Sequence, residues 1–300
     1  MPTVTLITSR QVLIDPAQGD PELLLVQAEL VGRGARCELA DWRQASVLSA
    51  SDLVVIKSPW DYPRHTAEFL TWLDRTESQT RVLNHPEVIR WNLDKRYLAE
   101  LAGRGVEVCP TVFCRTPDEV RGAIATLPGR VVVKPTVSAS SANTGLFEPD
   151  DPAALDLARR IVELGKEVMV QPAIASIAEL GERSLVYIDG RLVHAVRRGP
   201  LLALGGGMLP AGDRVASVCP VDAAPDERAL AEQVLAVAAE SMTARSVRES
   251  FLYARVDLVR DAAGRPMLAE LELFEPSLFL RLAPGAKQHY ADAVLARLEV

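Results

Sequence analysis

The chain has 300 residues, 48% of them hydrophobic, and a formal net charge of −7. This acidic balance argues against nucleic acid or an anionic membrane as the main partner, and no apolar run approaches the length of a membrane span. The length predicts two or three domains. The cysteines are scattered without metal-ligand spacing, which favours free thiols in a reducing cytoplasm: Cys37, Cys109, Cys114 and Cys219.

The first 90 residues alternate short apolar runs with helical patterns. Such an alternation predicts a parallel, doubly wound α/β sheet. No G-x-G-x-x-G motif follows the first strand, so an NAD-dependent oxidoreductase loses its main support. The predicted strands are 4–8, 37–39, 53–56 and 82–84, the predicted helices are 22–31 and 66–74, and a polar loop is predicted over 9–20.

The loop after the third strand is a candidate ligand site. Ligands of parallel sheets bind beyond the carboxyl ends of the strands, and Trp60, Asp61 and Tyr62 lie there between two prolines. An anion and two amphipathic aromatic side chains suit a small polar ligand. The alternative is a rigid turn that packs on its own tryptophan.

Two lysines in the middle of the chain indicate an anion site. A helix is predicted to begin near Lys95, and a cation in a first turn is unfavourable against the helix dipole unless an anion is nearby. The apolar strand 130–135 contains Lys134, and the small residues of 136–145 follow it. The backbone N–H groups and hydroxyls of such a loop can close over an anion. The alternative for this loop is a flexible connector.

The rest of the chain adds further elements to these. Thr116 and Asp151 precede helical patterns as N-caps, and Asp189-Gly190 predicts a hairpin turn. The predicted strands are 111–113, 167–171, 183–188 and 192–198, and the predicted helices are 117–127, 152–164, 226–240 and 284–298.

A C-terminal hairpin, 252–257 and 267–272, brings charges together. Its arms alternate polar and apolar residues, so Arg255 shares a face with Asp257, and Glu270 with Glu272. Three carboxylates on one surface repel each other and raise each other's pKa. A hard divalent cation such as Mg²⁺ is the simplest neutraliser. The alternative is a surface hairpin whose charges face water.

The order of these features resembles the ATP-grasp superfamily, in particular its glutathione synthetase and ribosomal-modification ligase types. The features are a helix-start lysine, a strand-end lysine before a small-residue loop, a strand ending in Gln-Pro, a Gly-Glu-Arg turn, and R-x-D and E-x-E on a C-terminal hairpin. The resemblance covers about 84–300. It implies a pre-ATP-grasp substrate domain over 1–90, a central lid domain over 91–172 and a C-terminal domain with the magnesium site over 173–300. In this α+β part the nucleotide would lie between two antiparallel sheets.

The resemblance also implies roles for individual residues in binding ATP. Two lysines would contact the phosphates and small residues would cover them, although family loops are usually richer in glycine. A strand end would read adenine and an acidic residue would hold the ribose. In that order these are Lys95 and Lys134, then Ser138, Ser140, Ser141 and Gly145, then Gln171, Ala173 and Ile174, and then Glu182.

The hairpin would carry the metal and the reacting phosphate. The resemblance implies that Asp257, Glu270 and Glu272 bind two Mg²⁺ ions, or Mn²⁺ in their place. Glu272 stands where the family commonly has asparagine, which adds a negative charge. Guanidinium groups would stabilise the transferred phosphoryl group: those of Arg255 and of Arg197 or Arg198.

Such parts imply an ADP-forming carbon–nitrogen ligase that works through an acyl-phosphate. Four motifs, 60–62, 91–95, 181–184 and 270–276, look like the subgroup that contains D-cycloserine synthetase, which activates the carboxylate of O-ureido-D-serine and closes a ring in antibiotic biosynthesis. The implied partner is a small amino-acid-like substrate, and the implied assembly is a homodimer or homotetramer. Another ATP-grasp amino-acid or peptide ligase and an inactive nucleotide-binding module are the alternatives. Substrate would meet Trp60, Asp61, Tyr62, His194, Glu275 and Ser277, although His194 can also be an ordinary hydrogen-bonded sheet residue.

Overall fold

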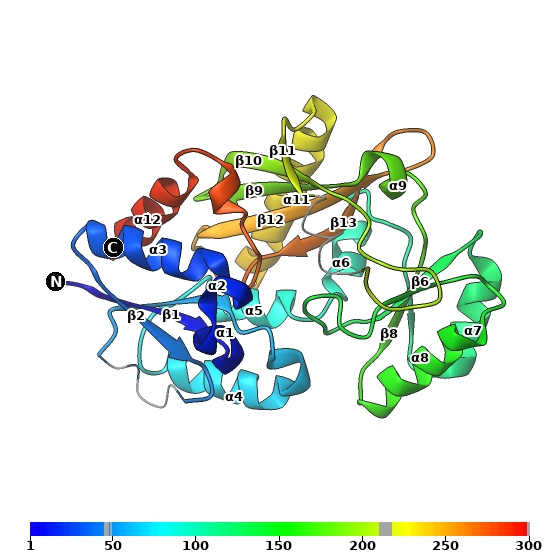
Figure 1. Ribbon diagram of the computed structural model, residues 1–300, viewed down its shortest axis with the longest axis horizontal. Coiled ribbons are helices and arrows are strands. Elements are labelled where there is room, and N and C mark those ends of the chain that lie inside the picture. Colours follow the sequence, from blue (N-terminus) through cyan, green and yellow to red (C-terminus); the bar gives the residue numbers. More distant parts are fainter. Residues whose placement is uncertain (45–47, 49, 210–217, 299–300) are drawn as a thin grey trace.

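The computed structural model of the protein describes residues 1–44, 48, 50–209 and 218–298. Three sheets follow one another along the molecule, and both chain ends lie beside the first of them (Figure 1). None of the helices in the described part combines the length and the apolar character that a membrane crossing requires. The division into 1–90, 91–172 and 173–300 stays a prediction, and 210–217 and 299–300 of its last part lie outside the described residues.

The first sheet is parallel, as the sequence predicts. Its strands are β1 (Thr3–Thr8), β2 (Arg36–Asp41), β3 (Leu53–Ser58) and β4 (Val82–Leu83), in the order β2-β1-β3-β4, and its helices are α3 (Pro21–Gly32), α4 (Thr66–Glu77) and the C-terminal α12 (Ala286–Ala296). Val4 and Leu6 of β1 pack with α3 and α12, whereas Ile7 packs with α4. Helices thus cover both faces of the sheet.

The segment 9–20 differs from the predicted loop, because it forms the short helices α1 (Arg10–Ile14) and α2 (Pro16–Gly19). Asp15 accepts a hydrogen bond from the Gln18 N–H, and Pro16 occupies the first turn of α2. Asp20 then caps α3 through the Glu22 N–H. The polar residues that indicated a loop include these helix caps.

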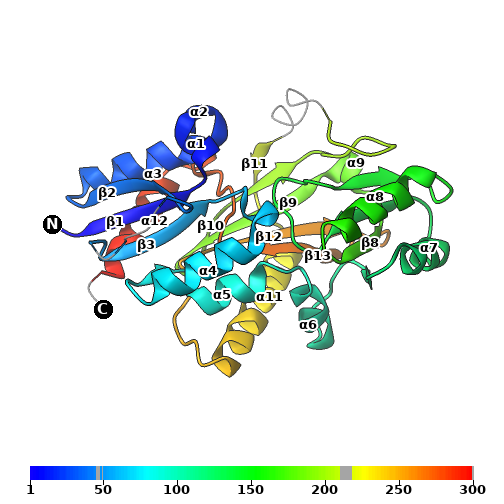
Figure 2. The ribbon, with the colours of Figure 1, turned by 90° about the horizontal axis from the view of Figure 1, so that it is seen from below.

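The second sheet is antiparallel and carries the charged hairpin. Its strands are β9 (Glu182–Ile188), β10 (Arg191–Arg198), β11 (Cys219–Val221), β12 (Tyr253–Arg260) and β13 (Pro266–Glu272), in the order β11-β10-β9-β12-β13; α11 (Pro225–Ala244) packs on β12 and β13 (Figure 2). Val256 and Leu271 belong to the same buried cluster as Leu230 of α11. The alternating hairpin residues therefore face the other side of the sheet.

The third sheet is also antiparallel and is covered by two helices. Its strands are β5 (Val112–Cys114), β6 (Val131–Pro135), β7 (Gly145–Phe147) and β8 (Val168–Pro172), in the order β5-β8-β6-β7, with α7 (Pro117–Thr126) and α8 (Pro152–Glu163) packed on one face. The predicted N-caps are confirmed, since Thr116 and Asp151 accept hydrogen bonds from the Glu119 and Ala153 N–H groups. Strand β7 was not predicted.

The segment that connects the first and third sheets corrects one prediction. It folds into α5 (Pro86–Asn92) and α6 (Tyr97–Gly103), so Lys95 lies in the turn between two helices rather than in the first turn of one. The Lys95 N–H donates to the Thr136 carbonyl, which ties this turn to the end of β6. The lysine is therefore placed by a tertiary contact, and the helix-dipole argument does not apply to it.

Side chains join the first sheet directly to the hairpin. The Asn84 amide donates to the Tyr253 and Leu273 carbonyls and accepts from the Leu252 N–H. The Tyr253 hydroxyl contacts the Ile56 and Phe274 carbonyls. Both side chains are buried. The N-terminal sheet is thus hydrogen-bonded to the strands that bear the charged residues.

Candidate active site

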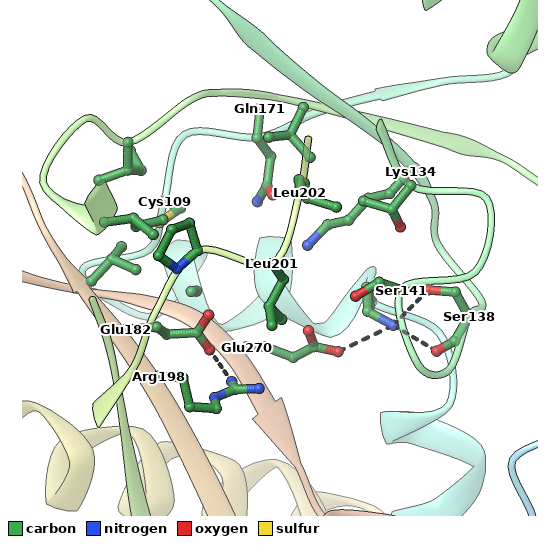
Figure 3. A pocket seen from close by; sticks show the side chains of 18 of the residues that line it. Cys109, Lys134, Ser138, Ser141, Gln171, Glu182, Arg198, Leu201, Leu202 and Glu270 are labelled. Atoms are coloured by element: carbon green, nitrogen blue, oxygen red, sulfur yellow. Dashed lines mark hydrogen bonds and ion pairs between the residues drawn. The ribbon is translucent and has the colours of Figure 1, made fainter. Parts of the chain in front are cut away.

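A cavity of about 870 Å³ lies where the second and third sheets face each other. Lys134 reaches it from β6, Gln171 from β8 and Glu270 from β13 (Figure 3). Its size is typical of a small-molecule site. The cavity continues to Trp60 and Tyr62 in the loop after β3. One continuous space thus joins all three sheets.

Most of the residues that the sequence indicates line this cavity. They are Trp60, Tyr62, Lys95, Lys134, Ser138, Ser140, Ser141, Gln171, Ala173, Ile174, Glu182, Arg198, Arg255, Glu270, Glu272, Glu275 and Ser277. Gly145, Asp61, His194, Arg197 and Asp257 are not among its lining residues.

Lys95 and Lys134 bring two ammonium groups to one end of the cavity. The Lys95 Nζ donates to the carbonyl and hydroxyl of Ser138 at 3.1 and 3.3 Å and pairs with Glu270 at 3.2 Å. Burial would lower the pKa of Lys95, but the nearby carboxylates, first Glu270, raise it. The pKa of Glu270 is lowered despite its burial, because Lys95 and Lys134 favour its ionised form. This end can neutralise a phosphate chain.

In the loop of small residues, serine and asparagine adopt a backbone conformation that glycine usually adopts. Ser140, Ser141 and Asn143 have φ angles of 51°, 55° and 55°, in the left-handed region that glycine usually occupies. Gly145 serves packing instead, since a Cβ there would lie 2.4 Å from the Phe147 ring. The prediction that Gly145 contacts the nucleotide therefore lacks support from its position, whereas Ser140 and Ser141 lie at the cavity.

The hairpin places its four charged side chains together, as the alternation predicts. Arg255 is paired with Glu272 across the two strands, and Asp257 with Glu270. The Arg255 Nε lies 2.9 Å from the Asp257 Oδ1, and its guanidinium also contacts Glu272. The predicted crowd of carboxylates is thus balanced by protein cations.

Arg198 completes this network from β10. Its guanidinium lies 2.8 Å from Asp257 and also contacts Glu182. Burial would raise the pKa of Asp257, but Arg198 and Arg255 lower it to about 2. At Glu182 and Glu272, burial affects the pKa more strongly than the same arginines do, and it raises each pKa to about 7. The network therefore holds one firmly ionised carboxylate and two that titrate near neutrality.

The metal assignment fits this network in part. No group of three His, Cys, Asp or Glu side chains is arranged to hold a metal within the described residues. Asp257 is 1% exposed and enclosed by two arginines, so its role as a ligand would require one of them to move. Glu270 and Glu272 do face the cavity. Two carboxylates plus substrate phosphates are a usual ligand set for Mg²⁺.

The other end of the cavity is aromatic and acidic. The Trp60 Nε1 donates to the Glu275 carbonyl at 3.0 Å, and the Tyr62 hydroxyl is near enough to the Glu275 carboxyl to favour its ionised form. Burial, with a contribution from Glu272, raises the pKa of Glu275 well above its usual value. This end can therefore offer a carboxyl group to a small polar substrate.

Three predicted residues point elsewhere for identifiable reasons. Asp61 accepts a hydrogen bond from the Trp42 Nε1 at 2.8 Å. His194 contacts the Leu278 carbonyl through Nε2 at 2.8 Å, so it acts on the backbone behind the cavity. Arg197 donates to the carbonyls of Glu179 and Leu180. Of the two adjacent arginines, Arg198 is the one at the cavity.

Comparison with known proteins identifies the family. Residues 4–84 match the family model described as D-cycloserine synthetase DcsG, N-terminal domain. The chain is 35% identical over 277 residues to the cycloserine biosynthesis protein DcsG of Streptomyces lavendulae, covering 89% of this chain and 90% of that protein. This chain belongs to the D-cycloserine synthetase family.

Solved structures agree with that membership of the D-cycloserine synthetase family. The crystal structure of D-cycloserine synthetase DcsG matches with a TM-score of 0.87 and 30% identity, over 99% of both chains. The ATP-grasp ligase PsnB, complexed with minimal precursor, Mg and ADP, matches with a TM-score of 0.59 and 18% identity over 99% of this chain and 98% of that one, which supports the fold. The predicted ATP-grasp fold is confirmed, and the protein is an ADP-forming carbon–nitrogen ligase.

Some cavity residues of this D-cycloserine synthetase relative were not foreseen. The ring of Phe279 lies 5.7 Å from the Arg255 guanidinium, and Cys109 also lines the space. A stretch after β10 adds Gly199, Pro200, Leu201, Leu202 and Met208. The glycine run 205–207 was the available sequence signal for that stretch, but it names no contact.

The titration of Glu182 and Glu272 predicts how the stability of this family member depends on pH. Each pKa rises from 4.5 to about 7 on folding, so the folded state holds these protons more tightly. That stabilisation is complete below about pH 4.5 and is lost as the pH rises through about 7. Without nucleotide, the Tm should fall by roughly 5 °C between pH 5.5 and 8, and Glu182→Gln should remove about half of this fall. Thermal unfolding followed by circular dichroism measures both; an unchanged slope in the variant would contradict the assignment.

Proposed function

We propose that this ligase uses ATP to close the ring of D-cycloserine from O-ureido-D-serine. The observation that carries the proposal is one cavity with two lysines and a carboxylate–guanidinium network at one end and Trp60, Tyr62 and Glu275 at the other. The family membership supports the choice of substrate. The first end suits the phosphates of ATP, and the second suits an amino acid.

The reaction has two transfers. A carboxylate oxygen of the substrate attacks the γ-phosphorus of ATP, ADP leaves, and an acyl-phosphate forms. The nitrogen bound to the side-chain oxygen then attacks the acyl carbon, and inorganic phosphate leaves as the ring closes. The carbamoyl group must also leave that nitrogen, which consumes a water molecule and releases carbon dioxide and ammonia.

The residues of this chain supply charge and orientation for these steps. Lys95 and Lys134 neutralise the phosphates of ATP, and Arg255 with Arg198 stabilises charge on the transferred phosphoryl group. Glu270 and Glu272 are the ligands proposed for Mg²⁺. Asp257 would be the third ligand if Arg198 or Arg255 moved away from it. When bound, Mg²⁺ would neutralise further phosphate charge. No side-chain nucleophile is needed.

The nucleotide and the amino acid would occupy neighbouring parts of the cavity. Gln171, Ala173 and Ile174 are proposed to meet the adenine, and Glu182 the ribose. Ser138, Ser140 and Ser141 are proposed to cover the phosphates. The Glu275 carboxyl would accept a hydrogen bond from the ammonium group of the substrate, whose charge would favour the ionised form of Glu275, with Tyr62 and Ser277 beside it.

The test is to mix the protein with ATP, Mg²⁺ and O-ureido-D-serine. Release of ADP and phosphate together with a product of the mass of cycloserine is the expected result. The L-enantiomer and ordinary amino-acid pairs serve as comparison substrates. Release of ADP with a pair of amino acids, but not with the ureido compound, would favour a peptide ligase and reject this proposal.

A further inference from the structure

The segment 273–280 forms one wall of the cavity. Residues 273–279 are neither strand nor helix, and residue 280 begins a short helical turn. Phe274, Glu275, Ser277 and Phe279 from this wall segment line the space. An irregular backbone that is largely buried needs partners for its polar groups, and its mobility depends on them. The source of these partners is therefore informative.

Side chains from other elements hold most positions of the wall segment. Its N–H and carbonyl groups meet eight side chains: Asn84 and Asn92 at Leu273, Tyr253 at Phe274, Trp60 at Glu275, Lys57 at Pro276, Arg255 at Ser277, Glu22 and His194 at Leu278, and Glu22 again at Leu280. The wall segment is thus positioned from outside rather than by its own turns.

Glu22 makes two of these contacts at one critical place. One carboxylate oxygen accepts the Leu278 N–H at 2.9 Å and the other accepts the Leu280 N–H at 2.7 Å. Between them Phe279 has φ 52° and ψ 34°, the left-handed conformation that a bulky residue avoids. The carboxylate therefore bridges the two amides that flank a strained residue.

Lys57 keeps this buried carboxylate compatible with its surroundings. The Lys57 Nζ lies 3.1 Å from Glu22 and 3.7 Å from Asp20, and it donates to the Pro276 carbonyl at 3.4 Å. Lys57 and Glu22 are 1% and 5% exposed. Burial would lower the pKa of Lys57, but the two carboxylates raise it, so the Lys57 ammonium group stays charged. Neutralising one partner of such a buried ion pair strongly destabilises the fold, because the other charge is left buried without compensation.

The strained residue leads to the reacting end of the cavity. The Phe279 ring lies 5.7 Å from the Arg255 guanidinium, which also donates to the Ser277 carbonyl at 3.0 Å. Arg255 is the cation that faces Asp257 and Glu272. Displacing the Phe279 backbone would therefore move its ring away from this guanidinium.

We propose that Glu22 is a positioning residue, which holds the amides on either side of Phe279 and thereby fixes the aromatic ring against Arg255. This role rests on the proposed function for its kinetic consequence but not for its structural one. Glu22 lies at the start of α3, outside the cavity lining, and acts only through the wall segment.

The first experiment compares Glu22→Gln with a control on the same helix, Glu29→Gln. A glutamine keeps one oxygen but turns an N–H₂ group toward an amide, so it holds one of the two N–H groups. Glu29 also pairs with cations, Arg33 and Lys287, but does not touch the wall segment. Hydrogen exchange should become at least roughly tenfold faster at the Leu278 or Leu280 amide in Glu22→Gln and stay unchanged in Glu29→Gln. Unchanged exchange in both variants would overturn the proposal.

The second experiment separates positioning from a general loss of stability. In Glu22→Gln, kcat/KM for the amino-acid substrate should fall roughly tenfold while the KM for ATP changes less than about twofold. Phe279→Gly removes the ring and accepts the left-handed backbone without support. In the Phe279→Gly background, Glu22→Gln should lower kcat/KM by less than about twofold, because the two residues act in one unit. A full tenfold loss there would show that Glu22 does not act through Phe279.

The two experiments also keep two failures apart. If the protein does not turn over O-ureido-D-serine, the proposed function fails, while hydrogen exchange still decides the structural role of Glu22. The kinetic cycle would then be measured with whichever carboxylate substrate supports ADP release. Faster exchange with unchanged kcat/KM would reject the link from Glu22 to Arg255.

Discussion

Replacing Glu270 with glutamine is expected to lower kcat by roughly 10²- to 10³-fold and to change the Kd for ADP by less than about threefold. The substitution keeps the shape of the side chain and removes the charge that faces the cavity. Glu270 pairs with Lys95 at 3.2 Å and lies opposite Asp257 on the neighbouring strand. Its carboxylate is therefore placed to hold a cation against the ATP phosphates during phosphoryl transfer, which explains the expected loss of kcat. The proposed adenine and ribose contacts lie elsewhere, so the Kd for ADP should change little.

The control for Glu270 is Glu167→Gln. Glu167 also pairs with cations, Arg96 and Arg115, but it does not line the cavity. Its substitution should leave kcat within about twofold. Turnover is measured as ADP release at saturating substrate, and ADP binding by calorimetry. Wild-type turnover in Glu270→Gln would remove Glu270 from the metal assignment.

Arg255→Met is expected both to lower kcat/KM by at least about 100-fold and to destabilise the fold by about 3–5 kcal/mol. Arg255 is 4% exposed, and its guanidinium contacts Asp257 and Glu272. Methionine fills a similar volume but leaves two carboxylates with less neutralisation. Repulsion between them should raise the pKa of Glu272 further.

The loss of stability in Arg255→Met should be partly reversible by a second change. Glu272→Gln in the same chain removes the carboxylate that has lost its partner, so the double variant should unfold at a higher Tm than Arg255→Met while remaining inactive. Arg260→Met, on the same strand, is the control, because Arg260 pairs with Asp226 and Glu227 outside the cavity. Equal kcat/KM in Arg255→Met and Arg260→Met would contradict the role of Arg255.

The sequence could predict what depends on local pattern. The alternation along 252–257 and 267–272 was enough to put Arg255, Asp257, Glu270 and Glu272 on one face, and the register confirms it. Lys134, the small-residue loop and the parallel first sheet followed in the same way. In each case neighbours along the chain carry the information.

The residues that the sequence misplaced depend on contacts between distant segments. Arg197 and Arg198 are adjacent in a strand, so they point to opposite faces, and only the packed sheet decides which one meets Asp257. Asp61 does not line the cavity because it is hydrogen-bonded to Trp42, and His194 does not because it is hydrogen-bonded to the carbonyl of Leu278. Glu22 could not be recognised at all, because its two partners lie more than 250 positions away in the chain.

The hydrogen bonds of Asn84 and Tyr253 have a consequence for making hybrid proteins. Asn84 and the carbonyl of Ile56 belong to the N-terminal part, but they are hydrogen-bonded to the backbone or side chains of 252, 253 and 273. An exchange of 1–84 between relatives would join these groups to foreign partners. A recombination design should therefore transfer 1–84 together with 252–253 and 273–280, so that the exchanged parts bring their own partners with them.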